Sequence, residues 1–327
     1  MRAIHCVAYG EPRQLVPVNL PEPAPGPGEA LVAVEAVGLG YADALQVRGG
    51  YQIKRPLPFI PGGEMAGRVV ALGAGVPAEW NGRTVLGMAP SGALAERIAM
   101  PLSGCVRRPG VLSAEAAAGM IVDYGTALYG LEEQGRLRAG EIVLILGASG
   151  GVGLAAVDLA KALGATVIAA ASSADKLALC KARGADHLLE YSQPDWRKAL
   201  EAVLAGRPLA VVYDPVGGPY SETAFRCLAP GGRLLVVGFA AGEIPRIPLN
   251  LPLLKRASIV GVDWGGHHRA NPGSSRQQLS RLVELAESGA IHPQATRIFP
   301  LEQAGEVLQA LVERRAQGKA VIRIGGA

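Results

Sequence analysis

The chain is poor in aromatic residues and contains no apolar run long enough to cross a membrane. Aromatic side chains make up 5% of its 327 residues. Each apolar window of about 18 residues includes Gly, Asp or Lys, which argues against a transmembrane helix. The opening residues, MRAIHCVAYGEP, contain no apolar core of the signal-peptide type. We therefore expect a cytoplasmic globular protein without a membrane partner.

Cysteine and charge of one sign are also scarce. None of the four cysteines (Cys6, Cys105, Cys180 and Cys227) forms a C-x-x-C motif or lies near a histidine at ligand spacing. We expect reduced, mostly buried thiols rather than a zinc site or disulfides. The net charge is +4 and the basic residues are dispersed, which gives no support to nucleic-acid binding.

Glycine and proline, by contrast, are plentiful, with 44 and 24 residues, as in a fold with many turns and short elements. The length suffices for two domains. The first part, up to about residue 120, is β-rich, with a proline-rich loop at 21–30 that cannot be a central strand and a short helix expected at 41–47. The expected strands of this part cover residues 30–37, 66–72, 84–87 and 94–100.

From residue 123 onward, strand-like and helical runs alternate. Six strands separated by helical crossovers predict an α/β domain, with a parallel sheet covered by helices on both faces. The expected strands cover residues 142–146, 166–170, 187–190, 209–214, 233–237 and 257–262. We place this domain at 123–264. Residues 265–327 begin with a polar loop, continue with two helices and a last strand, and are expected to complete the first domain, 1–122.

The stretch EIVLILGASGGVG at 141–153 carries the clearest functional signal. A short apolar strand stops at a glycine cluster and a helical pattern follows at once. This is the unit that lets backbone N–H groups and a helix N-terminus approach the pyrophosphate of a dinucleotide. G-x-G-x-x-A matches from Gly151 to Ala156, and A-x-G-x-x-G matches from Ala148 to Gly153. We prefer the second register, because it puts Gly153 where helix and sheet pack closely; a glycine-rich turn with no ligand is the alternative. The expected cofactor contacts are Ala148, Ser149, Gly150, Gly151, Val152 and Gly153.

The end of the second strand of this domain indicates which dinucleotide binds. NAD sites place a carboxylate there for the ribose 2′-hydroxyl, but this chain continues with Ser172, Ser173 and Lys176. Two hydroxyls and an ammonium would bind a 2′-phosphate by charge-assisted hydrogen bonds, and Tyr191, past the third strand, adds a hydroxyl. We therefore predict NADP(H) over NAD(H). In the alternative, the serines are an ordinary helix cap and the lysine is solvated.

Ordered pieces that span essentially the whole chain resemble the zinc-independent quinone oxidoreductases of the medium-chain dehydrogenase/reductase superfamily. The first pieces resemble the family's opening, a proline-rich loop before an x-x-D-x-x-x-R-x-G-x-Y segment, and then its P-G-x-E-x-x-G turn; in this chain four residues separate Asp43 from Arg48. The pieces are PEPAPGPGEALVAVEAVGLGYADALQVRGGY, PLPFIPGGEMAGRVVALG, DYGTALYGL, GASGGVG, VVYDPVGG, GGRLLVVGF and LLKRASIVGVDWG. PLPFIPGGE, GFAAGEIP and LLKRASIVG are most similar to the quinone oxidoreductase-like proteins.

This resemblance implies a GroES-like β domain interrupted by a doubly wound Rossmann domain, with the active site in the cleft between them. It also implies NADPH as the cofactor, a nicotinamide-site helix at 123–131 and usually a homodimer. In relatives the last Rossmann strand, 257–263 here, pairs across the two-fold axis, and its β-branched run would leave an open edge. The further cofactor contacts implied by family position are Gly238, Phe239, Val262, Asp263 and Trp264.

The zinc ligands of the superfamily are missing from this chain. Where zinc alcohol dehydrogenases carry Cys, His and Cys, it has Gly40–Tyr41, Gly63 and the region of Asp123, and the four-cysteine structural lobe is absent. Without thiolate or imidazole a tetrahedral zinc site cannot be built, so we expect no metal. Many relatives carry Asn in place of Gly40. Its loss removes an amide that could hold the nicotinamide or the substrate oxygen, and would enlarge the pocket.

Hydride transfer without a metal needs an acceptor that stabilises the developing charge itself. A quinone, or the β-carbon of an enone or enal, sends that charge onto a conjugated oxygen, so one or two hydrogen-bond donors suffice. By family position Tyr41 is the first candidate donor and Thr126 the second; a packed aromatic and a cofactor contact are the respective alternatives. The prediction is an NADPH-dependent quinone or activated-alkene reductase. The alternatives are an enoyl-thioester reductase and a cofactor-binding protein with little turnover.

The remaining ionisable residues are expected to be structural. Glu64 and Asp43 resemble family positions that anchor hydrogen-bond networks. None of the five histidines lies in a matched catalytic motif. His267 and His268 fall in the polar loop after the last strand of the α/β domain, where we expect solvent exposure.

Overall fold

The structure, a computed structural model, describes residues 1–325 of the chain. Its contacts divide the chain into two compact units. One is built from Met1–Val122 together with the residues from Asn271 on, and the other from Asp123–Ala270. The first unit is therefore discontinuous in sequence, and the second is inserted into it. No helix within residues 1–325 is long and apolar enough to span a bilayer.

The second unit is built around a six-stranded sheet in which every neighbouring pair is parallel. The strands are β8 (Ile142–Ile145), β9 (Thr166–Ala171), β10 (His187–Glu190), β11 (Leu209–Asp214), β12 (Leu228–Val236) and β13 (Ser258–Gly261). Their order is β10-β9-β8-β11-β12-β13, the doubly wound arrangement, and it reverses between β8 and β11. The predicted α/β class is confirmed. Such sheets bind ligands at the carboxyl ends of the strands, beside this reversal.

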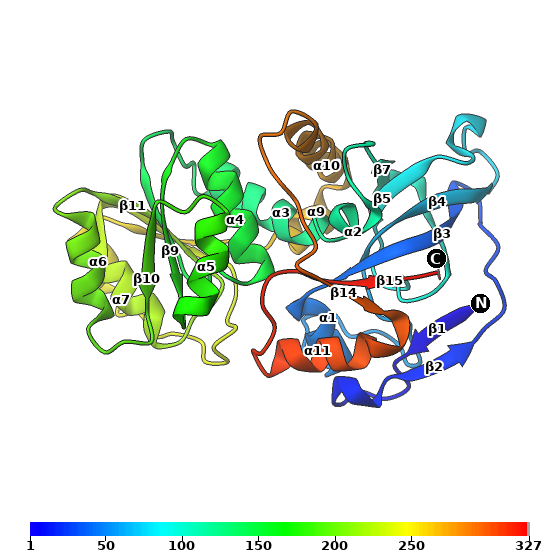
Figure 1. Cartoon of the computed structure of the whole chain (residues 1–327), viewed down its shortest axis with the longest axis horizontal. Helices are drawn as coiled ribbons and strands as arrows, with labels where there is room; N and C mark the ends of the chain where they lie inside the picture. Colours follow the sequence, from blue (N-terminus) through cyan, green and yellow to red (C-terminus); the bar gives the residue numbers. More distant parts are fainter. Residues whose placement is uncertain (326–327) are drawn as a thin grey trace. The chain divides into compact units, whose positions relative to one another are not determined.

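Helices cover both faces of this sheet (Figure 1). They form because apolar residues recur along one stripe: in α6, Trp196, Leu200 and Leu204 are buried. α6 and α7 share a core with the sheet that includes Phe225 and Val212, and α4 and α5 pack beside each other on the other face. The helices are α3 (Ile121–Leu128), which continues into the π-helical turn η4 (Tyr129–Gln134), α4 (Gly151–Ala162), α5 (Ala174–Ala182), α6 (Trp196–Leu204), α7 (Pro219–Cys227), α8 (Asn250–Lys255) and α9 (Trp264–Ala270).

The first unit is β-rich, as predicted. Its main sheet runs β14-β15-β3-β4-β5-β7, with β6 added to β3, and all pairs are antiparallel except β14 with β15. The strands are β1 (Arg2–His5) and β2 (Val16–Asn19), which form a separate pair, and β3 (Glu29–Leu39), β4 (Glu64–Leu72), β5 (Thr84–Met88), β6 (Arg97–Pro101), β7 (Cys105–Arg107), β14 (Arg297–Pro300) and β15 (Ala320–Arg323). The helices are α1 (Tyr41–Val47), α2 (Ala114–Ala118), α10 (Pro272–Glu287) and α11 (Ala304–Val312), with 3-10 turns η1 (Pro12–Gln14), η2 (Ala78–Trp80), η3 (Leu102–Gly104) and η5 (Leu301–Gln303).

A buried ion pair ties the last segment of the first unit to its centre. Lys319 and Glu64 form a salt bridge, and both residues are buried. Glu64 also accepts the backbone N–H of Val122 at 2.8 Å, which holds the beginning of α3. Removing one partner of such a pair costs about 3–5 kcal/mol, because the other charge stays buried. Glu64 therefore anchors a hydrogen-bond network, as its sequence position predicted.

Three features differ from the predictions. Residues 264–270 form α9 where a polar loop was predicted. The ring of Trp264 is buried against Gly125, and this contact outweighs the poor helix propensity of the Gly-Gly-His-His run. The division between the units falls at 270/271, whereas the sequence placed it at 264/265. β12 begins at Leu228 rather than at 233, because the strand continues through a proline and two glycines with a shift of register against β11.

All four cysteines are free thiols, and Cys227 alone is not fully buried. Burial raises the pKa of Cys105 and of Cys180 to about 12. These thiols therefore stay protonated and unreactive at neutral pH, in agreement with the expected reduced, buried state.

Candidate functional site

The glycine cluster after β8 forms a tight turn at the reversal of strand order. Gly147 has a positive φ of 58°, which glycine adopts without steric cost. The N–H of Ala148 donates to the carbonyl of Ala170 at 3.0 Å, and the N–H of Gly150 donates to that of Gly147 at 3.0 Å. Gly150 is the N-cap of α4 and supplies no capping side chain. The turn thus places the positive end of the helix dipole where an anion would bind.

Position 153 in this turn has no room for a side chain. A Cβ built on Gly153 would overlap the carbonyl oxygen of Gly147 and approach the Cα of Ala148 to 2.7 Å. Such close packing of helix on strand is what the preferred register requires of its last glycine. Of the other predicted contacts, Ser149 is buried and Val152 is the second residue of α4. The predicted phosphate contacts therefore lie in one compact turn.

Buried polar groups fasten α3 to α4. The carboxylate of Asp123 lies over the backbone of Gly151, where a built Cβ would overlap it. Tyr124 donates a 2.6 Å hydrogen bond to Asp158 and accepts one of 3.2 Å from Arg183. Burial, followed by the charge of Asp158, raises the pKa of Tyr124, so its phenol remains a donor. This network fixes α3 against the helix that follows the phosphate turn.

Thr126 is half-buried within a buried stretch of α3. Its neighbour Gly125 has no room for a side chain, because a Cβ there would lie 2.5 Å from the ring of Trp264. Asp263, by contrast, is exposed and accepts the N–H of Gly266 at 2.8 Å, so it caps α9. The structure places two predicted contacts, Thr126 and Trp264, on neighbouring elements and gives Asp263 a structural role as well.

The other predicted contacts follow β12 and β13. Val262 is buried and its N–H bonds to the end of β12 at 2.9 Å. The N–H of Gly238 bonds to the carbonyl of Asp214 at 3.3 Å, and the ring of Phe239 lies against Gly217. The buried carboxylate of Asp214 accepts two backbone N–H groups of the following loop at 2.8 Å. Asp214, which was not singled out as a site residue, thereby holds a loop at the carboxyl edge of the sheet.

The side chains predicted to bind a 2′-phosphate are assembled at the end of β9. Lys176 donates a 3.0 Å hydrogen bond to the hydroxyl of Ser172. Ser173 is the N-cap of α5 but makes no side-chain cap bond, so the ordinary-cap alternative does not apply to it. Tyr191 follows β10, and its ring centroid lies 4.4 Å from that of Tyr220. An ammonium and two hydroxyls therefore share one corner, with Tyr191 after the neighbouring strand.

A carboxylate beside this corner was missed in the sequence. Glu190 ends β10 in register with Ala171. Its carboxylate lies 2.7 Å from the hydroxyl of Ser192, which is 3.1 Å from the carbonyl oxygen of Ser172. Hydrogen bonds from Ser192 and then Gln193 hold the pKa of Glu190 below its usual range, so it is ionised at neutral pH. The signal was present at the end of the third strand, whereas the search for a carboxylate covered the end of the second.

Tyr41 belongs to the first unit, whereas Thr126 belongs to the second. Tyr41 is the half-buried first residue of α1. Asp43 accepts the N–H of Gly40 at 2.9 Å and so anchors the start of this helix, as predicted. A Cβ on Gly40 would have the Asp43 carboxylate, at 3.8 Å, as its nearest neighbour. Position 40 therefore has space for a larger side chain.

The prediction that His267 and His268 lie in solvent is wrong. His267 stacks on Tyr129 with ring centroids 4.6 Å apart, and His268 lies 5.2 Å from Trp264. Both histidines are half-buried. Burial, followed by the charges of His267 and Arg269, lowers the pKa of His268. The folding of residues 264–270 into α9, rather than a loop, brings these rings onto the rest of the unit.

Metal ligands do not gather in the part of the chain that the structure describes. Among residues 1–325, no group of three or more His, Cys, Asp or Glu side chains is placed to hold a metal ion. Position 63 in the first unit is a glycine and supplies no ligand atom. A Cβ built on Gly63 would lie 3.0 Å from the carbonyl oxygen of Ala89.

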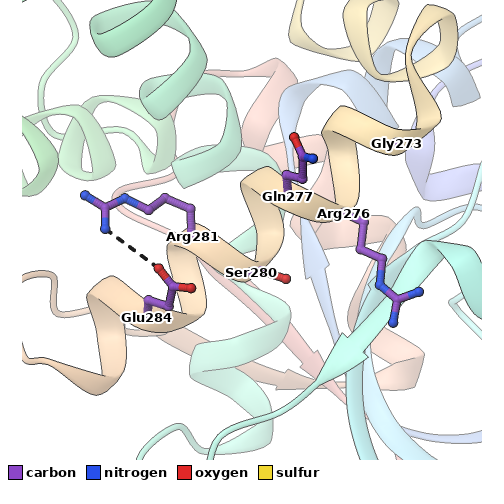
Figure 2. Close-up of a pocket in the computed structure, with 6 residues that line it drawn as sticks. All are labelled: Gly273, Arg276, Gln277, Ser280, Arg281 and Glu284. Carbon is purple, nitrogen blue, oxygen red and sulfur yellow. Dashed lines mark ion pairs between the residues drawn. The ribbon is translucent and has the colours of Figure 1, made fainter.

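An open hollow of about 570 Å³ runs along α10 of the first unit. Figure 2 shows Arg276 and Arg281 extending from the helix in different directions, and Arg281 pairs with Glu284 at 3.8 Å. None of the residues along it was a predicted site residue. Two guanidinium groups, an amide and a hydroxyl make it a donor-rich surface. The residues that line it are Gly273, Arg276, Gln277, Ser280, Arg281 and Glu284.

Two family models match consecutive parts of the chain. "Alcohol dehydrogenase GroES-like domain" covers residues 26–127, and "Zinc-binding dehydrogenase" covers residues 151–285. The curated quinone oxidoreductase-like protein 2 homolog of Nematostella vectensis is 34% identical over 323 residues, which is 98% of this chain and 88% of that protein.

Several solved structures have the same fold as this chain over almost its whole length. Mycobacterial Rv1454c complexed with NADPH is 30% identical with a TM-score of 0.90, over 99% of this chain and 100% of that one. The Escherichia coli quinone oxidoreductase complexed with NADPH is 27% identical with a TM-score of 0.88, over 99% and 100%. CurK enoyl reductase is 25% identical with a TM-score of 0.88, over 99% of both chains. The two matching family descriptions and the 34% identity over 98% of the chain show that it belongs to the quinone oxidoreductase family of the medium-chain dehydrogenase/reductase superfamily.

Proposed function

We propose that this protein is an NADPH-dependent oxidoreductase that transfers hydride to a quinone or to a conjugated enone or enal without a metal. One observation carries the proposal: a backbone phosphate turn at the reversal of the sheet adjoins a corner where Lys176 is hydrogen-bonded to Ser172 at 3.0 Å. NADPH supplies the hydride when it is bound. The protein contributes binding, orientation and hydrogen-bond donors.

The residues of the second unit fit this cofactor. The turn has no side chain at Gly150 or Gly153 to obstruct a diphosphate, and the N-terminus of α4 attracts negative charge. The 2′-phosphate would accept charge-assisted hydrogen bonds from Lys176 and from the hydroxyls of Ser172 and Ser173. The NADPH complexes of the mycobacterial and E. coli relatives support the same assignment.

The acceptor is proposed from the groups that the chain can offer to it. Gly40 and Gly63, at two of the zinc-ligand positions of the superfamily, provide no thiolate or imidazole. Polarisation then depends on hydroxyl donors, for which we propose Tyr41 first and Thr126 second. Donors of this strength suit a quinone or an activated alkene, because the charge develops on an already conjugated oxygen.

The test is NADPH oxidation by the purified full chain with quinones, enones, enals and enoyl-CoA thioesters. Turnover with quinones, enones or enals supports the proposal. A strong preference for enoyl-CoA supports the second candidate, an enoyl-thioester reductase, which the likeness to CurK enoyl reductase and the guanidinium groups of Arg276 and Arg281 on α10 favour. Saturable NADPH binding with no turnover across the panel would point to a cofactor-binding protein.

We also propose a homodimer formed through β13, one edge of the Rossmann sheet. Ile259 of this strand is 42% exposed, and Leu253 and Leu254 of the preceding helix are 75% and 72% exposed. An open edge next to exposed leucines is a surface that a second copy would cover. Sedimentation of the wild-type chain should give a dimer, and Ile259→Lys should shift it to monomer. A wild-type monomer at micromolar concentration would contradict this assembly.

A further inference from the structure

A buried carboxylate lies at the beginning of the helix that follows the phosphate turn. Asp123 is 5% exposed. A Cβ built on Gly151 would meet its carboxyl group, with Cγ at 3.0 Å and Oδ1 at 3.3 Å and with Oδ2 nearest of all. Gly151 is the first residue of α4, directly after the N-cap Gly150. A side chain of α3 therefore brings its charge against the positive end of α4.

α4 supplies no such charge itself. Its N-cap is a glycine without a capping side chain, and its own first turn contains no acidic residue. A carboxylate at this end is stabilised by the helix dipole. The hydrogen bond from Tyr124 to Asp158 of α4, at 2.6 Å, keeps the two helices in place. In the free protein Asp123 therefore supplies part of the negative charge that the helix N-terminus attracts.

We propose that Asp123 sets the overall affinity of the phosphate turn by opposing the charge of a bound diphosphate. The inference rests on the proposed binding of NADPH at this turn. The diphosphate and the carboxylate would both lie at the N-terminus of α4, in a region where burial weakens the screening of like charges. Because NADPH and NADH carry the same diphosphate, Asp123 weakens the two equally. Lys176 determines the ratio of the two affinities, whereas Asp123 lowers both affinities and so allows either cofactor to dissociate.

Asp123→Asn tests this with little change of shape. Titration calorimetry of the full chain should show the Kd for NADPH and the Kd for NADH each falling about tenfold, the equivalent of about 1.4 kcal/mol, with their ratio unchanged. The thermal midpoint of the cofactor-free protein should fall at the same time, because the helix dipole loses its charged partner. A residue with only a structural role would lower stability and affinity together.

The matched control is Asp195→Asn, which removes the same charge from a side chain that is 79% exposed at the start of α6. It should alter neither Kd. Asp123→Ser, which keeps an acceptor but no charge, is the second variant and should tighten binding in the same way. Unchanged or weaker binding of both cofactors by folded Asp123→Asn and Asp123→Ser overturns the inference while leaving the proposed function intact. A wild-type chain that saturates with neither cofactor overturns the proposed function and this inference with it.

Discussion

The two halves of the proposed cofactor site differ in the groups that form them: one consists of backbone and the other of side chains. The turn after β8 is backbone, held by the positive φ of Gly147 and by the close packing of Gly153 on the strand. The corner after β9 is made of side chains, with Lys176 on Ser172 and Glu190 near them. We expect the backbone half to recognise what all dinucleotides share, and it has no room for a side chain at Gly153. The side-chain half can change without disturbing the sheet, so we expect cofactor preference to be set there.

The largest effect is expected at Gly153 of the backbone half. Gly153→Ala puts a methyl group into the carbonyl of Gly147 and against Ala148, and we expect it to cost about 3 kcal/mol of unfolding free energy and to weaken NADPH and NADH together. Urea unfolding and titration calorimetry measure the two effects. Gly110→Ala, where a built Cβ has no neighbour within 4 Å, is the control. A stable Gly153→Ala protein with normal affinity would show that the turn is not as tight as described.

A selective effect is expected in the side-chain half. Lys176→Ala removes one charge-assisted hydrogen bond, so the Kd for NADPH should rise about 10- to 100-fold while that for NADH stays nearly the same. Lys181→Ala, in the last turn of the same helix, should change neither. Equal losses for both cofactors would mean that the two halves do not divide their roles in this way.

The strand beneath the turn offers a stability change that should leave both halves untouched. Tyr213 of β11 is completely buried, and its hydroxyl has no hydrogen-bond partner among residues 1–325. Such a group costs about 1–3 kcal/mol to bury. Tyr213→Phe should therefore raise the free energy of unfolding by about 1 kcal/mol without moving either Kd. A destabilised variant, or one with altered cofactor affinity, would reveal a use for the hydroxyl.

The smallest effect is expected at Glu190. Its carboxylate is ionised and lies near Ser172 through Ser192, so Glu190→Gln should improve the preference for NADPH over NADH by about twofold, as for an exposed, solvent-screened charge. The ratio of the two Kd values is the measurement. Glu201→Gln, which removes an exposed carboxylate of α6, should leave that ratio unchanged. A shift toward NADH would indicate that Glu190 instead orients the 2′-phosphate ligands.

The central strands of the Rossmann sheet, β8, β9 and β11, were predictable because they are buried on both faces. β8 is buried at every position and reads as an unbroken apolar run between turn signals. The phosphate turn was predictable as well, because its geometry requires glycine at Gly147, which has a positive φ, and at Gly153, which has no room for a Cβ. The short helix at 41–47 was predicted from the glycines that follow it. Patterns of this kind depend on residues that are neighbours in sequence, so they can be recognised from the sequence alone.

What the sequence did not reveal depends on partners far along the chain. α9 forms because Trp264 meets Gly125, and a Gly-Gly-His-His run gives no local sign of a helix. Asp123 was noted only as the occupant of a missing zinc position, whereas its contact with Gly151 appears once α3 packs on α4. The roles of Tyr41, Thr126 and the individual cofactor contacts are predictions, because they depend on a ligand rather than on a local pattern.

The first unit is discontinuous in sequence, and this has a consequence for how the protein folds during synthesis. Residues 123–270 leave the ribosome as one continuous piece and contain every strand of their own sheet, so this piece can acquire its shape during translation. The N-terminal strands are synthesised earlier, but their sheet stays incomplete. Glu64 has no salt-bridge partner until Lys319 has been synthesised, and β3 cannot pair with β15 before then. A nascent chain stalled before this point would contain a complete Rossmann sheet and a first unit whose sheet still lacks β14 and β15.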